Sequence, residues 1–310
     1  MKELKPINQS KLFGLSNFFL ELVHLYDNRK LPNKILLSGQ KGQGKSTLAY
    51  HLINYILSKG EKFEYDLDKK EINQNNHTFI TVNNKSNPNF ILVDVGEDKK
   101  TIDINQIRNL IQNLNKSSFN EKPRFILIDN IEYLNTNSIN ALLKVVEEPS
   151  INVFFILINN NKKILPTLIS RCINFKISLP FFENLDVANK LLEGEIYSMI
   201  NKDLISYYST PGNIYNLAMF GKENNYKLDE LNLNNFLNNI IRDKYYKKDN
   251  LIKYLIFDLI EYHLTKISSS ISTSFSFKYS YFIEKISQVK KFNLDEESLL
   301  IEFKNKVLNE

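Results

Sequence analysis

Cysteine, tryptophan and glycine are scarce in this chain of 310 residues. The one cysteine, Cys172, excludes a disulfide within the chain and a zinc site built from several thiolates. The four histidines stand far apart in the sequence, at His24, His51, His77 and His263, and do not suggest a histidine-rich metal site. We therefore expect no structural metal and, in particular, no zinc.

Long apolar runs are also missing. No run of about eighteen apolar residues occurs, so no transmembrane helix is expected. The N-terminal MKELKPINQSKLFG lacks the apolar core of a secretory signal. Hydrophobic residues make up 43% and charged residues 24% of the chain, which is ordinary for globular proteins, and the net charge of +5 permits contact with nucleic acid without requiring it. These features predict a soluble cytoplasmic protein with no membrane partner.

Short apolar runs alternate with amphipathic stretches over the first 180 residues. The apolar runs predict strands at 34–39, 89–95, 123–129, 152–160 and 172–180. Helical spacing of apolar residues predicts helices at 12–30, 46–60, 101–118 and 137–150, and a short helix or turn at 164–171. This alternation is typical of an α/β fold with a parallel sheet covered by helices. The polar stretch 61–88 is expected to form a surface loop or small insertion.

The pattern becomes mainly helical after Pro180. We predict three domains, namely an α/β domain over 1–180, a small helical domain over 181–226 and a second helical domain over 227–310. A helix is expected at 294–309. The segment 273–282 alternates like a strand, but no partner strand is evident nearby, so a helix is favoured there as well.

Three of the nine glycines fall within six residues. The segment GQKGQGKS (39–46) fits the pattern G-x-x-x-x-G-K-[ST] and lies between a predicted strand and a predicted helix, which is the context that a phosphate-binding loop requires. Backbone N–H groups would surround phosphate oxygens, with Lys45 at the β- and γ-phosphates and Ser46 on Mg²⁺. The alternative is a glycine-rich turn with an incidental lysine. The expected nucleotide-binding residues are Gly39, Gln40, Lys41, Gly42, Gln43, Gly44, Lys45, Ser46, Thr47 and Asp129.

Asp129 ends a predicted strand and is the expected second ligand of Mg²⁺. An exposed aspartate that caps a turn is the alternative. The next residue, Asn130, stands where ATPases of this kind usually carry a glutamate, and an amide cannot accept a proton from water at neutral pH. We therefore expect ATP or ADP to bind with Mg²⁺ and to be hydrolysed weakly. Glu132, Glu147 and Glu148 could replace the missing base, but charged side chains of this kind are mostly solvated.

Further segments carry a family resemblance. FILIDN (125–130), NSINALLKVVEEP (137–149) and LPTLISRC (165–172) follow the phosphate-binding loop in this order. The sequence resembles bacterial clamp loader subunits of the AAA+ class, most closely over 1–180. The segment NLDEESLLIEF (293–303) is similar to the last collar helix of the delta-prime type. The resemblance implies a RecA-like nucleotide-binding domain, a helical lid and an all-α collar for the three predicted domains.

The same resemblance implies a role for Arg171. It would be an arginine finger that acts in trans on ATP bound to a neighbouring motor subunit. A surface ion pair is the alternative. The implied role is that of a non-motor clamp loader subunit within bacterial DNA polymerase III, which assembles with motor (gamma/tau) and delta subunits. This assembly would load the sliding clamp on primer–template DNA. Any polymerase activity would belong to the holoenzyme, and the alternative is a motor ATPase.

Several positions depart from the family pattern. The segment 61–88 contains no cysteine where many relatives carry a zinc module. Asn213 stands where a sensor arginine is usual, and Ile158 and Asn159 stand near the position of the residue that senses the γ-phosphate. These departures weaken hydrolysis in cis and favour the delta-prime type over the motor type.

One basic stretch is a candidate for contact with nucleic acid. IRDKYYKKDNLIKY (241–254) interleaves lysines and one arginine with tyrosines, a combination that suits phosphates and base stacking. A solvated helix face over packed aromatic residues is the alternative, and we favour it because charge runs usually lie on solvated faces.

Overall fold

The computed structural model describes residues 4–96, 99, 101–116, 120–147, 152–268, 273–292 and 294–309. Glu148 and the last residues of the helices predicted at 101–118 and 137–150 lie outside these ranges. The chain divides into two compact units, Met1–Glu183 and Asn184–Glu310. The division into three domains that the sequence predicts, with boundaries at 180/181 and 226/227, stays a prediction.

A five-stranded parallel sheet forms the first unit and confirms the predicted α/β fold. The spatial order of the strands is β2-β3-β4-β1-β5. Their bounds are Lys34–Ser38 for β1, Phe90–Val93 for β2, Arg124–Ile128 for β3, Val153–Asn159 for β4 and Ile173–Lys176 for β5. All strands run in one direction, so residues that follow their carboxyl ends gather at one edge of the sheet.

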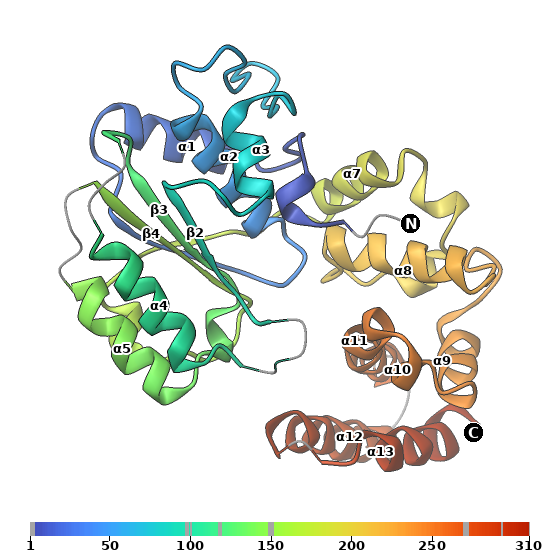
Figure 1. Ribbon diagram of the computed structural model, residues 1–310. Coiled ribbons are helices and arrows are strands. Elements are labelled where there is room, and N and C mark those ends of the chain that lie inside the picture. Colours follow the sequence, from blue (N-terminus) through green and yellow to red (C-terminus); the bar gives the residue numbers. More distant parts are fainter. Residues whose placement is uncertain are drawn as a thin grey trace. The chain divides into compact units, whose positions relative to one another are not determined.

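Helices cover both faces of the sheet (Figure 1). One face carries α1 (Ser16–Asp27), α2 (Lys45–Leu57) and α3 (His77–Asn83), and the other carries α4 (Ile104–Leu114) and α5 (Thr136–Glu147). Successive side chains of a strand point to opposite faces. Accordingly, Phe125 and Leu127 of β3 pack toward α1 and α2, whereas Ile126 and Ile128 pack toward α4 and α5. The double cover explains why β1 to β4 are mostly apolar, whereas β5 at the end of the strand order alternates apolar and polar residues and is largely exposed.

The polar segment 61–88 is more ordered than the sequence predicted, because it contains α3. Asn76 caps this helix by accepting a hydrogen bond from the backbone N–H of Phe79. The side chains of Asn76 and Asn54 also exchange two hydrogen bonds, at 3.0 and 3.3 Å, although both are buried. Buried His51 lies 2.8 Å from the hydroxyl of Tyr65. Polar side chains of α2 thus hold the insertion in place, a role that apolar periodicity does not reveal.

The second unit is built from helices. Their bounds are Pro211–Glu223 for α8, Leu233–Arg242 for α9, Tyr245–Lys248 for α10, Asn250–Ser268 for α11, Thr273–Phe292 for α12 and Glu296–Phe303 for α13. Before them, α7 (Phe181–Leu192) crosses the boundary between the units, and after them the π-helical residues Lys304–Leu308 continue α13. Within the described part of the chain, every helix is too short or too polar to span a lipid bilayer.

The helix predicted at 273–282 is confirmed, since α12 begins at Thr273. Its buried side chains include Phe282, Ile286 and Val289, which lie on one face of the helix. Among the side chains of α12 that the structure describes, the buried ones begin at Phe282, at the end of the segment 273–282 whose sequence alternates like a strand. The helix predicted at 294–309 is observed as α13 and its π-helical continuation.

Candidate nucleotide-binding site

The glycine-rich loop connects β1 to α2, as the motif requires. Gly39, Gly42 and Gly44 have φ angles of 152°, 87° and 80°, which side-chain-bearing residues rarely adopt. A Cβ atom on Gly39 would lie 2.1 Å from the main-chain oxygen of Ile177, just after β5. The loop therefore depends on glycine both for its backbone angles and for its close contact with the neighbouring strand.

The residues predicted for nucleotide binding in the segment 39–47 all lie in this loop and the first turn of α2. Gln40 and Lys41 are exposed, whereas Gln43 and Lys45 are buried. The ammonium group of Lys45 donates to the main-chain oxygens of Gly39, at 2.9 Å, and Gln40, at 2.6 Å. Burial lowers the pKa of Lys45 to about 8, against the opposing effect of the nearby carboxylates Asp129 and Glu132. An anionic ligand would restore the stability of this buried charge.

Asp129 follows β3 and lies beside the loop, as predicted. Its Oδ2 accepts a hydrogen bond of 2.6 Å from the hydroxyl of Ser46, and its Oδ1 accepts one of 2.8 Å from the backbone N–H of Asn130. Burial raises the pKa of Asp129 to about 6, although the hydrogen bond from Ser46 opposes this shift. A hydroxyl and a carboxylate in direct contact are a suitable pair of oxygen ligands for a divalent cation.

The chemistry of these groups fits a magnesium–nucleotide complex. Loop N–H groups and Lys45 suit phosphate oxygens, while Ser46 and Asp129 suit Mg²⁺. In addition, the side-chain oxygen Oε1 of Gln43 is buried without a hydrogen-bond partner among the described residues. The donors of the loop and of Lys45 therefore suit an anion, and the unsatisfied oxygen of Gln43 leaves an acceptor for a further donor.

Asn130 is held in a polar network at the same edge of the sheet. It has a φ angle of 55°, and its Nδ2 donates to Oδ1 of Asp94 at 2.8 Å. Asn160 donates to Oδ1 of Asn130 at 2.8 Å and to Oε1 of Glu132 at 3.0 Å. Glu132 also lies close enough to Lys45 to raise the pKa of that lysine. The expectation that Glu132 is simply solvated is therefore wrong, because Asn160 holds it within the site.

Two members of this network, Asp94 and Asn160, were missed in the sequence. Each follows directly after a strand, β2 and β4 respectively, which is the placement that singled out Asp129. Asn159, which stands near the usual position of the γ-phosphate sensor, exchanges hydrogen bonds of 2.9 and 3.1 Å with the main chain of Lys162 in the turn after β4. Ile158 is buried in the core. The polar side chain that joins the site is thus Asn160, one residue further along the chain.

Arg171 lies at the opposite edge of the sheet from the loop. It precedes β5, whose first residue pairs with Ile35 and whose last residue pairs with Ser38, directly before Gly39. The stretch of β1 from Ile35 to Ser38 that pairs with β5 spans about 10 Å, at roughly 3.3 Å per residue. Arg171 lies before the start of this stretch, and the loop follows its end. The side chain of Arg171 contacts Glu147, the last residue of α5. Arg171 therefore lies away from the nucleotide-binding loop of its own chain.

Arg171 forms an ion pair, which was the alternative considered for it. Its Nε donates to Oε1 of Glu147 at 3.0 Å, and its Nη2 donates to the same oxygen at 2.5 Å. Its Nη1 donates to the main-chain oxygen of Thr167 at 2.8 Å. The neighbouring Cys172 is half-buried, and burial raises the pKa of its thiol to about 11. The thiol is therefore protonated at neutral pH and is a poor nucleophile.

Two features of the second unit were singled out in the sequence, namely Asn213 and the basic stretch 241–254, and residues of the same unit contact both. Asn213 lies in the first turn of α8, where its backbone N–H binds the hydroxyl of Thr210 at 3.2 Å. In the basic stretch 241–254, Lys244 and Lys247 both pair with Glu297, at 2.8 and 2.5 Å.

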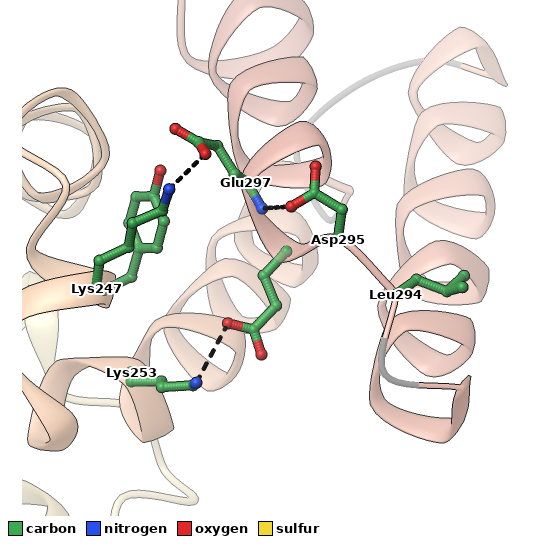
Figure 2. Close-up of a pocket in the computed structure, with 7 residues that line it drawn as sticks. Lys247, Lys253, Leu294, Asp295 and Glu297 are labelled. Carbon is green, nitrogen blue, oxygen red and sulfur yellow. Dashed lines mark hydrogen bonds and ion pairs between the residues drawn. The ribbon is translucent and has the colours of Figure 1, made fainter.

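An open pocket of about 380 Å³ adjoins these pairs (Figure 2). It is lined by Tyr246, Lys247, Lys253, Leu294, Asp295, Glu296 and Glu297. The lysines face carboxylates of α13 and its cap, which favours the solvated-face interpretation over a nucleic-acid surface.

Known proteins share the sequence pattern of the first unit. The family model described as "DNA polymerase III, delta subunit" matches residues 15–180, more than half of the chain. The DNA polymerase III subunit delta' of Buchnera aphidicola subsp. Baizongia pistaciae is 29% identical over 177 residues, which are 55% of this chain and 51% of that protein. The DNA polymerase III subunit gamma/tau of Mycoplasma genitalium is 29% identical over 175 residues, which are 56% of this chain and 28% of that protein.

Among solved structures, a DNA polymerase III gamma subunit-related protein from Thermotoga maritima has a TM-score of 0.49 and 17% identity, over 91% of this chain and 96% of that one. The chain spans about half or less of the length of the two curated relatives. The match to the family model over 15–180 nevertheless covers most of the first unit. The chain therefore belongs to the DNA polymerase III delta-subunit family, and its similarity to delta' and gamma/tau proteins confirms the resemblance to clamp loader subunits.

Proposed function

We propose that the chain is a delta-prime-type, non-motor subunit of a bacterial clamp loader, which acts in the cytoplasm during DNA replication. In this proposal it joins motor (gamma/tau) and delta subunits in a ring that loads the sliding clamp on primer–template DNA. Residues 181–226 serve as a helical lid and 227–310 as the collar. The chain binds ATP or ADP through the loop 39–47, with Mg²⁺ at Ser46 and Asp129.

The position of Arg171 carries the proposal. The guanidinium lies at the amino edge of the sheet, whereas the loop and Asp129 lie at the carboxyl edge. An arginine so placed does not reach a phosphate bound in its own loop. It is suited instead to the nucleotide of an adjacent subunit, where a positive charge would stabilise the charge that develops on the transferred phosphoryl group. This supports a role as an arginine finger in trans.

The surroundings of Asn130 support weak hydrolysis by the chain itself. Its amide nitrogen is engaged by Asp94 and its amide oxygen by Asn160. An amide held in this way cannot take the proton of an attacking water. The site is therefore better suited to holding a nucleotide than to turning it over rapidly.

One observation favours the alternative, a motor ATPase of the gamma/tau type. Glu132 lies near Lys45 and receives two hydrogen bonds from Asn160, one from the backbone N–H at 3.3 Å and one from the side chain at 3.0 Å. A carboxylate in this position could accept a proton from water. In that case the purified chain would show magnesium-dependent turnover, and Glu132→Gln would abolish it.

The test is steady-state ATP hydrolysis by the chain alone and in the assembled loader with motor and delta subunits on primed DNA. We expect little turnover by the chain alone. In the assembly, Arg171→Ala should lower the rate by about 10³-fold or more at the site it serves. Arg108→Ala, which removes an exposed arginine of the same unit, is the matched control and should leave the rate unchanged.

Two outcomes would contradict the proposal. Strong turnover by the isolated chain would identify it as a motor. An assembly whose rate does not change with Arg171→Ala would exclude the arginine finger. As a further check, Lys45→Ala should abolish nucleotide binding by this chain yet leave most of the clamp loading of the assembly intact.

A further inference from the structure

The guanidinium of Arg171 is held on one side and open on the other. Among the described residues, three of its five N–H groups have partners, namely Nε–H and one Nη2–H on Oε1 of Glu147 and one Nη1–H on the oxygen of Thr167. One N–H group remains on each terminal nitrogen. Two N–H groups of a planar guanidinium on neighbouring nitrogens match two oxygens of a phosphate in the geometry of a fork.

Glu147 is itself fixed to the sheet. It is the last residue of α5, and its main-chain oxygen accepts a hydrogen bond of 3.3 Å from Nζ of Lys34, the first residue of β1. Thr167 lies in α6 (Pro166–Ile169), just before Arg171. The carboxylate and the carbonyl that hold Arg171 thus come from two helices at the amino edge of the sheet. A side chain held by such supports loses less freedom when it binds a further ligand.

The charge of Glu147 opposes binding of a phosphate by Arg171, but solvent weakens this effect. The side chain of Glu147 is 50% exposed and that of Arg171 is 32% exposed. At this exposure the attraction and repulsion between charges are strongly reduced, and an ion pair contributes little to folding stability. The directional hydrogen bonds from Nε and Nη2 remain. The effect of Glu147 in orienting the guanidinium should therefore outweigh its competition with the phosphate for Arg171. Removal of the carboxylate should leave the fold intact.

We propose that Glu147 is a positioning residue for Arg171, which orients the guanidinium so that its open N–H groups meet the nucleotide phosphates of a neighbouring subunit. This inference rests on the proposed function of Arg171 in trans. In it, Glu147 affects hydrolysis only because it orients the guanidinium of Arg171. Glu147 itself makes no contact with nucleotide in this proposal.

The test compares Glu147→Ala and Glu147→Gln in the assembled clamp loader on primed DNA, with kcat and KM for ATP measured separately. Glutamine keeps a side-chain oxygen that can accept from Nε and Nη2 but removes the charge. We expect Glu147→Ala to lower kcat about ten- to a hundredfold with little change in KM, as for a misplaced catalytic group. Glu147→Gln should stay within about threefold of the wild type, since only the screened charge is lost.

The matched control is Asp27→Ala. Asp27 also forms an ion pair on the first unit, with Lys59 at 2.6 Å and a side-chain exposure of 42%. Its loss should leave kcat unchanged, and thermal unfolding should confirm that all variants are folded. A result in which Arg171→Ala lowers the rate but Glu147→Ala does not would overturn this inference alone.

A faster rate in both Glu147 variants would also overturn it, because Glu147 would then compete with the phosphate for Arg171. If Arg171→Ala itself has no effect, the proposed function fails, and the inference fails with it. The three results are distinguishable from one another.

Discussion

The two buried charges of the nucleotide site have pKa values shifted toward each other. Burial lowers the pKa of Lys45 to about 8 and raises the pKa of Asp129 to about 6. Both shifts arise because burial removes water from the charged groups and so disfavours their charged forms. The attraction between the ammonium and the carboxylate compensates for this loss only in part. A bound phosphate would favour the ammonium and a bound Mg²⁺ would favour the carboxylate. If the chain binds a nucleotide as proposed, these residues contribute to ligand binding at the expense of stability in the ligand-free chain.

At this scale we predict that Lys45→Met abolishes binding of Mg–ADP and leaves the stability of the ligand-free chain nearly unchanged. Loss of the buried ammonium removes a desolvation cost but also two hydrogen bonds, so the free energy of unfolding without ligand should stay within about 1 kcal/mol of the wild type. Wild type should gain about 2.7 kcal/mol from Mg–ADP at a hundred times its Kd, and the variant should gain nothing. Urea unfolding with and without Mg–ADP measures both. The exposed Lys62→Met is the control, and a variant that retains the Mg–ADP effect would contradict the prediction.

The pKa of Asp129 predicts how nucleotide binding depends on pH. A carboxylate with a raised pKa takes up a proton as the pH falls through about 6, and the neutral acid is a poor ligand of Mg²⁺. Magnesium-dependent affinity should therefore fall by up to about tenfold per unit below pH 6. Calorimetric titration with Mg–ADP between pH 5 and 8 tests this. Asp129→Asn should bind weakly throughout and report only the titration of the nucleotide itself; an equally steep decline in this variant would exclude Asp129 as the cause.

At the scale of elements, the parallel sheet separates two sets of functional groups. Residues after the carboxyl ends of β1, β2, β3 and β4 form the candidate nucleotide site, and residues before the amino end of β5 hold Arg171. The loop after β1 is also packed against the segment after β5, because the backbone N–H of Ile177 donates to the oxygen of Ser38 at 2.7 Å. The short edge strand β5 thus supports the loop at its end and the arginine at its beginning.

This close packing makes a substitution at Gly39 costly. Gly39→Ala places a Cβ atom 2.1 Å from the oxygen of Ile177 at a φ angle of 152°, so loop and strand must move apart. We expect a loss of about 3 kcal/mol or more of unfolding free energy, together with loss of Mg–ADP binding. Gly60→Ala is the matched control, since Gly60 has a φ angle of 81° but no atom within 4 Å of the added Cβ. It should cost only about 1 kcal/mol, and equal losses in the two variants would contradict the packing argument.

At the scale of the whole molecule, the candidate nucleotide site and Arg171 belong to the same unit but to opposite edges of its sheet. Such a unit can present an arginine on one side and a nucleotide site on the other. That arrangement is compatible with heterologous contacts between successive subunits of a ring. The proposed function of the chain is accordingly a property of an assembly.

The full chain should not depend on a metal for its stability. Within the part that the structure describes, no three Asp, Glu, His or Cys side chains gather to hold a metal ion, and the insertion 61–88 is attached through the pairs Asn54–Asn76 and His51–Tyr65. In nucleotide-free buffer, EDTA should therefore shift the thermal midpoint by less than about 1 °C. Addition of Zn²⁺ should not raise it. A midpoint that falls with EDTA and recovers with Zn²⁺ would reveal a structural site and contradict the prediction that zinc is absent.

Local features were sufficient to predict much of the fold and the position of the glycine-rich loop between β1 and α2. Apolar runs and helical spacing predicted the strands and most helices of the first unit, since both depend on neighbours within a few residues. The spacing of Gly39, Gly42 and Gly44 before Lys45 predicted a strand–loop–helix connection in the same way, and phosphate binding by this loop stays a prediction. The short helix α3 was missed because the buried pairs Asn54–Asn76 and His51–Tyr65 hold its segment, and polar pairs leave no apolar periodicity.

The sequence by itself thus determined the order of the elements, the loop and Asp129, because each is set by a local pattern. Only the tertiary structure decided that Asn160 and Glu132 join the site, and that Arg171 rests on Glu147 at the far edge of the sheet. These contacts join residues 24 or more positions apart in the chain. They follow from the strand order β2-β3-β4-β1-β5, which no local pattern encodes, since it results from packing of the whole unit around its two hydrophobic layers.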